Sequence, residues 1–388
     1  MNRSYLRKKM YKGFRRLIAL LDIIVPKNKY LIICASADGI VYRGNARYFF
    51  EYMNKNKRKF PPYQVYYYLN TNKKIPFNEM KLTFDLKGII TFLRAKYIIG
   101  THSTTDFVPM GFSFRKIFIH TWHGTPLKRI CLAEKRWDKF SEKRRKKKEK
   151  RHNWGNKARY FLSQSEIITS VLCRCFNKTD KSILMTGLPR NDHLINPAKS
   201  NILIRLLGKK VKNKKIILYA PTFREWKETE LFPFKDMDYE KLDNFLGENN
   251  LIILMRTHYS EKGKNKLAHK KNILPFSSRI FEEANEVLPE VDILITDYSG
   301  IYLDYLLLDR PIFFFDYDLD EYEKERGFMY NDIDFWMPGP HIRSLKEFFV
   351  ELKKEDKYSQ QRNRINKLIN THQTEDSCSK IINFLKNQ

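Results

Sequence analysis

Histidine and basic residues follow an apolar run near the middle of the chain, and their spacing suits phosphate chemistry. His123 comes directly after the apolar run Lys116–Trp122 and is followed by Gly124, so its imidazole would stand beside backbone that a ligand can approach closely. A histidine titrates near neutral pH, which suits a general base that accepts the proton of an attacking hydroxyl. Lys128 adds positive charge nearby. The alternative is a structural imidazole that is hydrogen-bonded within a turn.

Two further segments place charged or hydroxyl side chains after apolar runs. Arg256 and His258 follow the run Leu251–Leu254, and residues two apart on an extended segment point to the same side. This pair suits a phosphate, because Arg makes bidentate contacts and His can donate or accept a proton. Another apolar run is followed by Thr222 and Arg224, which offer a hydroxyl and a guanidinium.

A fourth segment combines a buried-type strand with a helix start. The apolar run Asp292–Thr296 precedes Ser299 and Gly300, after which an amphipathic helical pattern begins. Ser299 can cap this helix, and the free amide groups at a helix N-terminus attract anions. Capping and phosphate binding are both compatible with the pattern.

The elements that must position these side chains follow from the apolar pattern. Short β-rich runs predict buried strands at Tyr30–Ala35, Gln64–Leu69, Ala95–Gly100, Lys116–Trp122, Lys215–Ala220, Leu251–Arg256, Val291–Thr296 and Pro311–Asp316. Helices are expected at Gly44–Asn54, Tyr239–Leu246, Arg279–Val287 and Gly300–Leu308. Strands that alternate with helices are typical of parallel sheets covered on both faces. The pattern therefore predicts an α/β fold with two doubly wound domains facing a central cleft.

The predicted domain boundaries follow breaks in this pattern. Residues 1–25 are expected to form a basic amphipathic helix, residues 26–200 the first α/β domain, and residues 201–343 the second. Residues 344–388 are expected to form polar C-terminal helices. A basic insert, residues 134–154, interrupts the first domain.

The N-terminal helix and the basic insert suggest an anionic partner. In the helix, apolar residues recur at spacings of three and four: Leu6, Met10, Phe14, Leu17, Leu21 and Ile24. It suits a helix lying on an anionic membrane surface, or one packed on its own domain with a solvated basic face. The Lys/Arg-rich insert is flanked by Trp137 and Trp154, and Trp favours the headgroup level of a bilayer. A plain solvated helix and a nucleic-acid contact are the alternatives for the insert.

Composition narrows the class of protein. The chain has 388 residues, 73 Lys and Arg against 44 Asp and Glu, and a net charge of +29. Its 42% hydrophobic content excludes a disordered chain. Five Cys without disulfide or zinc spacing favour a reducing compartment, and no apolar run is long enough for a membrane span. We expect a cytoplasmic protein without a resident metal or cofactor; Asp316-Tyr317-Asp318, an acid-x-acid pattern, is the one segment with a metal-binding alternative.

These motifs together resemble a known family. The matching stretches are Thr121–Lys128, Tyr219–Arg224, Arg256–His258, Asp292–Ser299, Arg310–Phe315 and Tyr317–Tyr322. Their order and spacing resemble the CDP-glycerol glycerophosphotransferases of teichoic acid synthesis, particularly the short, primase-sized members. The resemblance implies a GT-B-like fold of two Rossmann-type domains, with the donor nucleotide mainly on the C-terminal one.

The resemblance also implies roles for individual residues. His123 matches the catalytic histidine of the Trp-His-Gly motif, and His258 matches the second essential histidine. Residues implied on the donor and phosphate side are Arg256, Ser299, Thr222, Arg224, Asp297, Gly300 and Asp304. Residues of the first motif, implied on the acceptor side, are Gly124, Thr125 and Lys128. Gly300 departs from the family pattern, where members commonly carry a second Ser.

The expected activity is the transfer of a polyol phosphate, glycerol phosphate foremost, from a CDP-activated donor to a hydroxyl with release of CMP. The expected acceptor is a polyprenyl-linked saccharide or polymer, and the expected location is the cytoplasmic face of the membrane, bound peripherally. Alternative enzymes use CDP-ribitol, build a capsule polymer, or transfer sugar from a nucleotide sugar. A basic nucleic-acid-binding protein is the alternative from another class, but it gives no role to the two histidines that follow strands, His123 and His258.

Overall fold

The chain folds into two α/β units, which we describe separately. The computed structural model describes residues 3–135, 141–144, 146, 157–198, 200–256 and 270–388. The first unit comprises residues 1–123, 140–192 and 372–388, and the second comprises residues 124–139 and 193–371. The chain therefore passes between the units within the first motif, at the peptide bond that joins His123 to Gly124.

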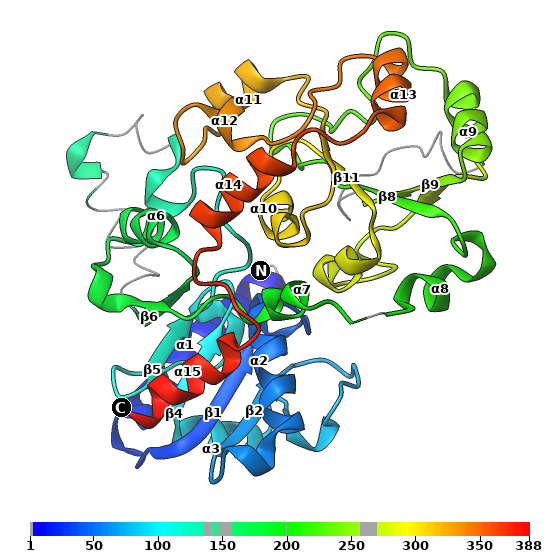
Figure 1. Cartoon of the computed structure of the whole chain (residues 1–388). Coiled ribbons are helices and arrows are strands. Elements are labelled where there is room, and N and C mark those ends of the chain that lie inside the picture. Colours follow the sequence, from blue (N-terminus) through cyan, green and yellow to red (C-terminus); the bar gives the residue numbers. More distant parts are fainter. Residues whose placement is uncertain (1–2, 136–140, 145, 147–156, 199, 257–269) are drawn as a thin grey trace. The chain divides into compact units, whose positions relative to one another are not determined.

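The first unit contains a seven-stranded parallel sheet in the order β3-β2-β1-β4-β5-β6-β7 (Figure 1). Its strands are β1 Asn28–Ala35, β2 Gln64–Tyr68, β3 Lys81–Leu82, β4 Ala95–Gly100, β5 Ile117–His120, β6 Ala158–Ser163 and β7 Ile183–Met185. The strand order reverses between β1 and β4, and ligands of doubly wound sheets bind beyond the carboxyl ends of the strands at such a point.

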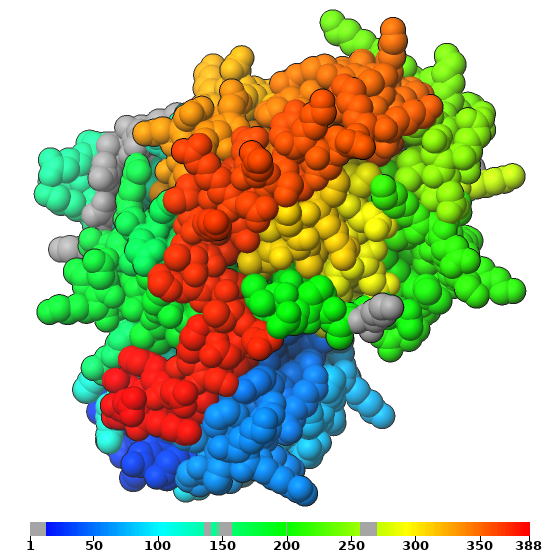
Figure 2. Space-filling view, in the orientation of Figure 1, coloured from blue at the N-terminus to red at the C-terminus, as the bar shows by residue number. Residues whose placement is uncertain are grey.

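Helices cover both faces of this sheet because alternate strand residues point to opposite sides. On one face, Ile32 and Ile99 pack with α2 Gly44–Lys55 and α15 Ser377–Lys386. The space-filling view shows red α15 lying beside the blue segment that contains α2 (Figure 2). The opposite face carries aromatic rings, among them Phe118. The remaining helices of this unit are α1 Arg3–Ile24, α3 Leu86–Arg94 and α6 Glu166–Phe176.

The second unit has the same strand order on a smaller scale, β10-β9-β8-β11-β12, again with parallel pairing throughout. Its strands are β8 Lys215–Tyr219, β9 Leu251–Met255, β10 Ile273–Pro275, β11 Ile293–Thr296 and β12 Ile312–Phe314. Its helices are α8 Ile202–Leu207, α9 Tyr239–Glu248, α10 Ile301–Tyr305, α11 Leu319–Glu325, α12 Ile333–Trp336, α13 Leu345–Lys353 and α14 Ser359–Ile369. Helix α7, Asp192–Ile195, begins at the boundary between the units. The predicted α/β class with two doubly wound sheets is confirmed.

The predicted strands are present with ends within two residues of the expected ones, and the structure adds β3, β6, β7 and β10. The helix expected at Arg279–Val287 is wrong: turns occupy its first part, and a 3-10 helix spans Ala284–Glu290. The carbonyl groups of Phe281 and Glu282 accept hydrogen bonds from Arg256 instead of from a following helical turn. These bonds tie the turn to Arg256 in its non-helical conformation.

Helix α1 packs on its own unit, one of the two arrangements that the sequence left open. Ile18 and Asp22 are buried against the first unit, whereas Leu17, Leu20 and Ile24 are exposed. Asp22 accepts hydrogen bonds from the backbone and hydroxyl groups of one serine, Ser113, and forms an ion pair with Lys116 at 2.9 Å. These contacts fix the helix to its unit while leaving an apolar strip in solvent.

Much of the basic insert, including Trp137 and Trp154, lies outside the described residues. Among the helices that the structure describes, none combines the length and apolarity needed to cross a bilayer.

Candidate active site

His123 lies at the carboxyl edge of the first unit's sheet, on the loop that follows β5. The preceding His120 fixes this loop with both ring nitrogens. Its Nε2–H donates to the carbonyl of His102 at 3.0 Å, and its Nδ1 accepts from the backbone N–H of Trp122 at 3.1 Å. Burial lowers the pKa of His120 to about 4, so this ring stays neutral at physiological pH.

The backbone of the loop is held from two other parts of the unit. The side-chain amide of Asn45, on α2, donates to the carbonyl of Thr121 at 3.2 Å and to that of Trp122 at 3.3 Å. The guanidinium of Arg190 donates to the carbonyl of His123 at 3.1 Å. Trp122 adopts a left-handed φ of 54°, a conformation that costs energy in a residue other than glycine. The chain thus turns sharply just before His123.

His123 is an exposed residue, but its imidazole is flanked by two rings. The ring of His102 stacks on it with centroids 4.6 Å apart and an interplanar angle of 7°, and the indole of Trp122 lies at 4.1 Å. The pKa of His123 is well below the usual histidine value, first through desolvation by the chain around it and then through repulsion from His102 and His120. A neutral imidazole at neutral pH has the protonation state that a general base requires.

The rest of the first motif belongs to the second unit. Thr125 donates a hydrogen bond from its hydroxyl to Asp304 at 2.9 Å, and both side chains are buried. Further along, Arg129 donates from its backbone to the carbonyl of Gly327 at 2.9 Å. Desolvation and repulsion from Arg326 lower the pKa of Lys128 to about 8. The structure therefore assigns Thr125 and Asp304 a shared structural contact, while Lys128 carries an amine whose charge neighbouring cations disfavour.

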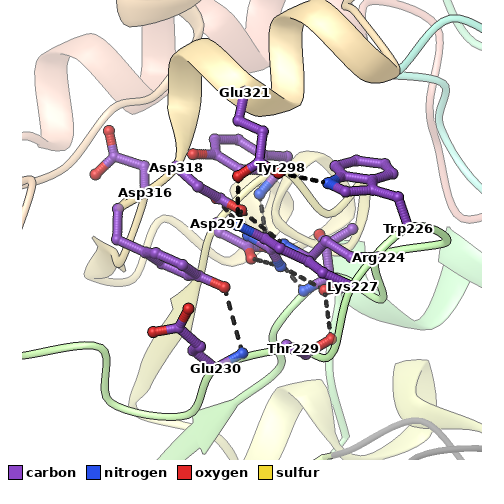
Figure 3. Close-up of polar contacts among 12 residues, drawn as sticks. Arg224, Trp226, Lys227, Thr229, Glu230, Asp297, Tyr298, Asp316, Asp318 and Glu321 are labelled. Carbon is purple, nitrogen blue, oxygen red and sulfur yellow. Dashed lines mark hydrogen bonds and ion pairs between the residues drawn. The ribbon is translucent and has the colours of Figure 1, made fainter.

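Arg224 lies at the centre of a buried ion-pair cluster in the second unit (Figure 3). Its Nε and Nη2 atoms donate to Asp318 at 3.1 and 2.7 Å, and its Nη1 donates to Asp297 at 2.5 Å. Burial alone would lower the pKa of Arg224, but Asp297 and Asp318 together raise it above the usual arginine value. The guanidinium that the sequence offered to a phosphate is engaged by these two carboxylates.

Both carboxylate oxygens of Asp297 accept hydrogen bonds, whereas the side-chain hydroxyl of Thr222 has no partner in the part of the chain that the structure describes. One oxygen of Asp297 accepts from the backbone N–H groups of Thr222 at 2.8 Å and Tyr298 at 2.7 Å, while the other accepts from Arg224. The buried hydroxyl of Thr222 has no hydrogen-bond partner among the described residues. Thr222 lies two residues beyond Ala220, just past the carboxyl end of β8.

The two carboxylates of the acid-x-acid segment pair with different cationic side chains. Asp316 accepts hydrogen bonds from His341 at 2.8 Å and from Arg343 at 2.6 Å, and Asp318 binds Arg224 and Lys227. Within the described residues, no cluster of three or more His, Cys, Asp or Glu side chains has the arrangement of a metal site.

Ser299 and Gly300 lie where β11 leads into the short helix α10. The expected cap by Ser299 is not formed, because Gly300 occupies the cap position and the Ser299 hydroxyl lies 3.5 Å from the backbone nitrogen of Ile301. A side chain at position 300 would place its Cβ 2.4 Å from the carbonyl oxygen of Thr125. Glycine at this position therefore permits a close backbone approach.

Arg256, at the end of β9, donates to the carbonyls of Phe281 at 2.7 Å and Glu282 at 2.9 Å. It also lies over the ring of Phe276, 5.9 Å from its centroid. In this structure the guanidinium thus organises the loop after β10. His258 lies outside the described residues, so its role and its pairing with Arg256 remain predictions.

Sequence reasoning missed His102, which stacks on His123. Its signal was available, since Thr101 and His102 follow the predicted strand Ala95–Gly100 just as His123 follows the next predicted strand. Within each unit the structure brings together His102 with His123, and Thr222 with Arg224 and Asp297.

Comparison with known proteins gives a consistent set of relatives. Residues 17–387 match the family described as CDP-Glycerol:Poly(glycerophosphate) glycerophosphotransferase. The teichoic acid poly(glycerol phosphate) polymerase of Bacillus spizizenii is 30% identical over 369 residues, which cover 92% of this chain and 90% of that protein. The enzyme of the same name from Bacillus subtilis is 29% identical over 90% of this chain, but the chain spans only 47% of its length.

A solved structure shares the whole fold. A histidine-to-asparagine variant of the wall teichoic acid polymerase TagF, soaked with CDPG, superposes with a TM-score of 0.80 at 25% identity. The match covers 100% of this chain and 98% of that one. The two parallel sheets with Rossmann strand order are thus GT-B-like, as the sequence predicted.

Proposed function

Because the chain belongs to the CDP-Glycerol:Poly(glycerophosphate) glycerophosphotransferase family, we propose that it transfers glycerol phosphate from CDP-glycerol to a hydroxyl of a growing or nascent cell-surface polymer. The products are the extended polymer and CMP. The observation that carries this proposal is His123, whose pKa lies well below the ordinary histidine value at the carboxyl edge of a doubly wound sheet, within the family's Trp-His-Gly motif.

The proposed step is an attack of the acceptor oxygen on the β-phosphorus of the donor. The new bond joins that oxygen to phosphorus, the bond from phosphorus to the CMP oxygen breaks, and the acceptor's proton passes to His123. Neutral His123 is competent for this, because a protonated imidazole has no lone pair to offer. The Thr222 hydroxyl, buried and unpartnered among the described residues, would hydrogen-bond the donor's phosphates. We assign His258 and Ser299 to the same phosphate side on the family motif.

We further propose that the first unit binds an anionic membrane surface, where a polyprenyl-linked acceptor would reside. An apolar strip on α1 is formed by Leu17, Leu20 and Ile24, which are 52%, 63% and 71% exposed. Helix α3 adds exposed Leu86 and Ile90.

One contact places a further exposed apolar residue near α1. Phe114 is 84% exposed, and the next residue, Arg115, donates a hydrogen bond to the carbonyl of Ile23 on α1. An exposed apolar strip on a helix of a strongly basic chain is typical of interfacial helices.

The test is a transfer assay with the purified full chain, a lipid-linked saccharide acceptor, and CDP-glycerol, CDP-ribitol or a UDP-sugar as donor. We expect CMP release and a product heavier by one or more glycerol phosphate units with CDP-glycerol. Release of CMP with CDP-ribitol alone would show that the donor carries ribitol instead of glycerol. Release of a nucleoside diphosphate from the UDP-sugar alone would show that the enzyme transfers a sugar and not a polyol phosphate.

A further inference from the structure

The rings of His102 and His123 meet because two neighbouring strands end together. Strands β4 and β5 are parallel, with Gly100 opposite His120 in the register. The chain continues from each strand end toward the same edge of the sheet, and the backbone N–H of Thr121 still donates to the carbonyl of Gly100 at 2.8 Å. The result is the near-parallel stack of His102 on His123, 4.6 Å between centroids.

His102 is held more firmly than the ring it supports. Its backbone N–H donates to Asp106 at 2.8 Å, and its carbonyl accepts from the His120 ring. Its Nδ1 lies 2.7 Å from the hydroxyl of Thr101, which lies 2.6 Å from the hydroxyl of Ser36. Both hydroxyl-bearing residues are fully buried. A buried chain of hydrogen bonds of this kind fixes a side chain in one rotamer.

His123 has fewer restraints on its own side chain. It is exposed, and Arg190 holds its backbone carbonyl rather than its ring. The ring of Trp122 also touches it, but at a tilt of 34° and from the same loop. The ring of His123 also hydrogen-bonds to the backbone of Thr101, at the end of β4, which opposes the lowering of its pKa. That bond holds one edge of the ring, whereas His102 is the neighbour from β4 that stacks on its face.

The charges around the pair keep the supporting ring neutral. Burial and the nearby Arg43 lower the pKa of His102 to about 4, against a smaller opposing effect of Asp38. The titratable groups that face His123 within the unit are His102, His120 and Arg190. A neutral imidazole can remain stacked on His123 when that ring gains a proton, whereas a second imidazolium would repel it.

We infer that His102 is a positioning residue for the transfer reaction, whose fixed ring sets the plane in which His123 meets the acceptor hydroxyl. This inference rests on the proposed function. It gives the segment Thr101-His102 the role of holding the His123 ring in place. Misplacing a reacting group by about 1 Å can cost ~10²-fold in rate, so the support of the ring has a measurable consequence.

Steady-state kinetics of CMP release tests the inference with four variants. We expect His102→Ala to lower kcat by ~10²-fold with little change in KM for the donor. His102→Phe keeps a flat ring and should recover most of kcat. Thr101→Val removes the hydroxyl that holds His102 and should give an intermediate loss. The matched control is His372→Ala, because His372 is partly exposed in the same unit and its ring hydrogen-bonds to the side chain of Glu166 at 2.7 Å.

An NMR titration of the histidine rings tests the contact without any substrate, with the His123 signal assigned from a His123→Asn variant. We expect the pKa of His123 to rise in both His102→Ala and His102→Phe, because each removes the repulsion from His102, and to stay below the ordinary histidine value, because desolvation is the larger cause. The inference is overturned if His102→Ala keeps kcat within threefold, if His102→Phe is as impaired as the alanine variant, or if the titration does not change. Absence of CMP release from the wild type would instead reject the proposed function. The titration would still show whether the His102 ring contacts the His123 ring.

Discussion

Arg224 and Asp318 form a bidentate ion pair in the interior of the second unit, with nitrogen-to-oxygen distances of 3.1 and 2.7 Å. They are 94 residues apart in the chain, and the guanidinium side chain is completely buried. Asp297 completes the pairing on the third nitrogen. The cluster joins the loop after β8 to the segments after β11 and β12 (Figure 3).

The first prediction concerns the stability of this cluster. Arg224→Met should destabilise the protein by about 3–5 kcal/mol, because it removes the buried cation that pairs with Asp297 and leaves Asp318 with Lys227 alone. Urea denaturation followed by circular dichroism measures the change. The control is Lys241→Ala, which breaks an exposed ion pair with Asp238 and should change stability by less than about 0.5 kcal/mol. Unchanged stability together with lost donor affinity would make Arg224 a phosphate ligand after all.

A second prediction follows from the role proposed for His123. His123→Ala should lower kcat by ~10²–10⁴-fold, the usual contribution of a positioned general base, while the thermal midpoint stays close to that of the wild type. His258→Ala should have a similar effect on the basis of its motif. A well-folded His123→Ala variant with near-normal turnover at saturating substrate would refute the assignment.

The third prediction distinguishes phosphate binding from capping at Ser299. Because the Ser299 hydroxyl makes only a long contact within α10, Ser299→Ala should leave stability almost unchanged. Loss of a hydrogen bond to a charged phosphate should weaken donor binding by roughly 1.5–3 kcal/mol. Isothermal titration with CDP-glycerol measures this. A lower melting temperature with normal donor affinity would show that the residue serves the helix instead.

The fourth prediction is a pH effect at Asp192, at the boundary between the units. Burial raises the pKa of Asp192 to about 7, despite hydrogen bonds from Ser377 and Gln373 that favour its charged form. The folded chain therefore binds a proton here that the unfolded chain releases above pH ~4. This contribution to stability is fully present below pH ~4 and is lost as the pH rises to about 7.

Asp192→Asn provides the test, since the amide keeps the shape and a carbonyl that can accept from Gln373. Thermal midpoints of the two proteins should differ little at pH 4, and the variant should become the more stable one as the pH approaches 7. Parallel curves across this range would contradict the raised pKa.

The fifth prediction tests membrane binding. The full chain should sediment with vesicles that contain anionic lipid and much less with neutral ones, because each Lys or Arg near an anionic surface contributes about 1 kcal/mol. High salt should release a substantial fraction. Leu20→Asp and Ile24→Asp should reduce the fraction of protein that stays bound to vesicles at high salt. Val350→Asp, at an exposed apolar residue of the second unit, serves as control. Equal binding to both vesicle types would reject the electrostatic contribution.

The sequence by itself determined the local elements and the family. Strand and helix periodicity is a property of neighbouring residues, so the runs around β1, β4, β8 and β9 were readable directly. The same holds for His123, because a histidine placed just after a buried strand must emerge at the carboxyl edge of a parallel sheet. Short motifs in a fixed order were sufficient to identify the relatives that the comparisons confirm.

Tertiary structure decided which of the candidate residues are free for chemistry. Arg224 looked like a phosphate ligand until Asp297 and Asp318, 73 and 94 residues away, were found against it. The segment Arg279–Val287 has helical spacing, yet it forms turns whose carbonyls accept hydrogen bonds from Arg256, followed by a 3-10 helix. Such outcomes depend on desolvation and on partners distant in the chain, and a local pattern contains neither. For the same reason the stack of His102 on His123 appeared only once β4 and β5 were placed side by side.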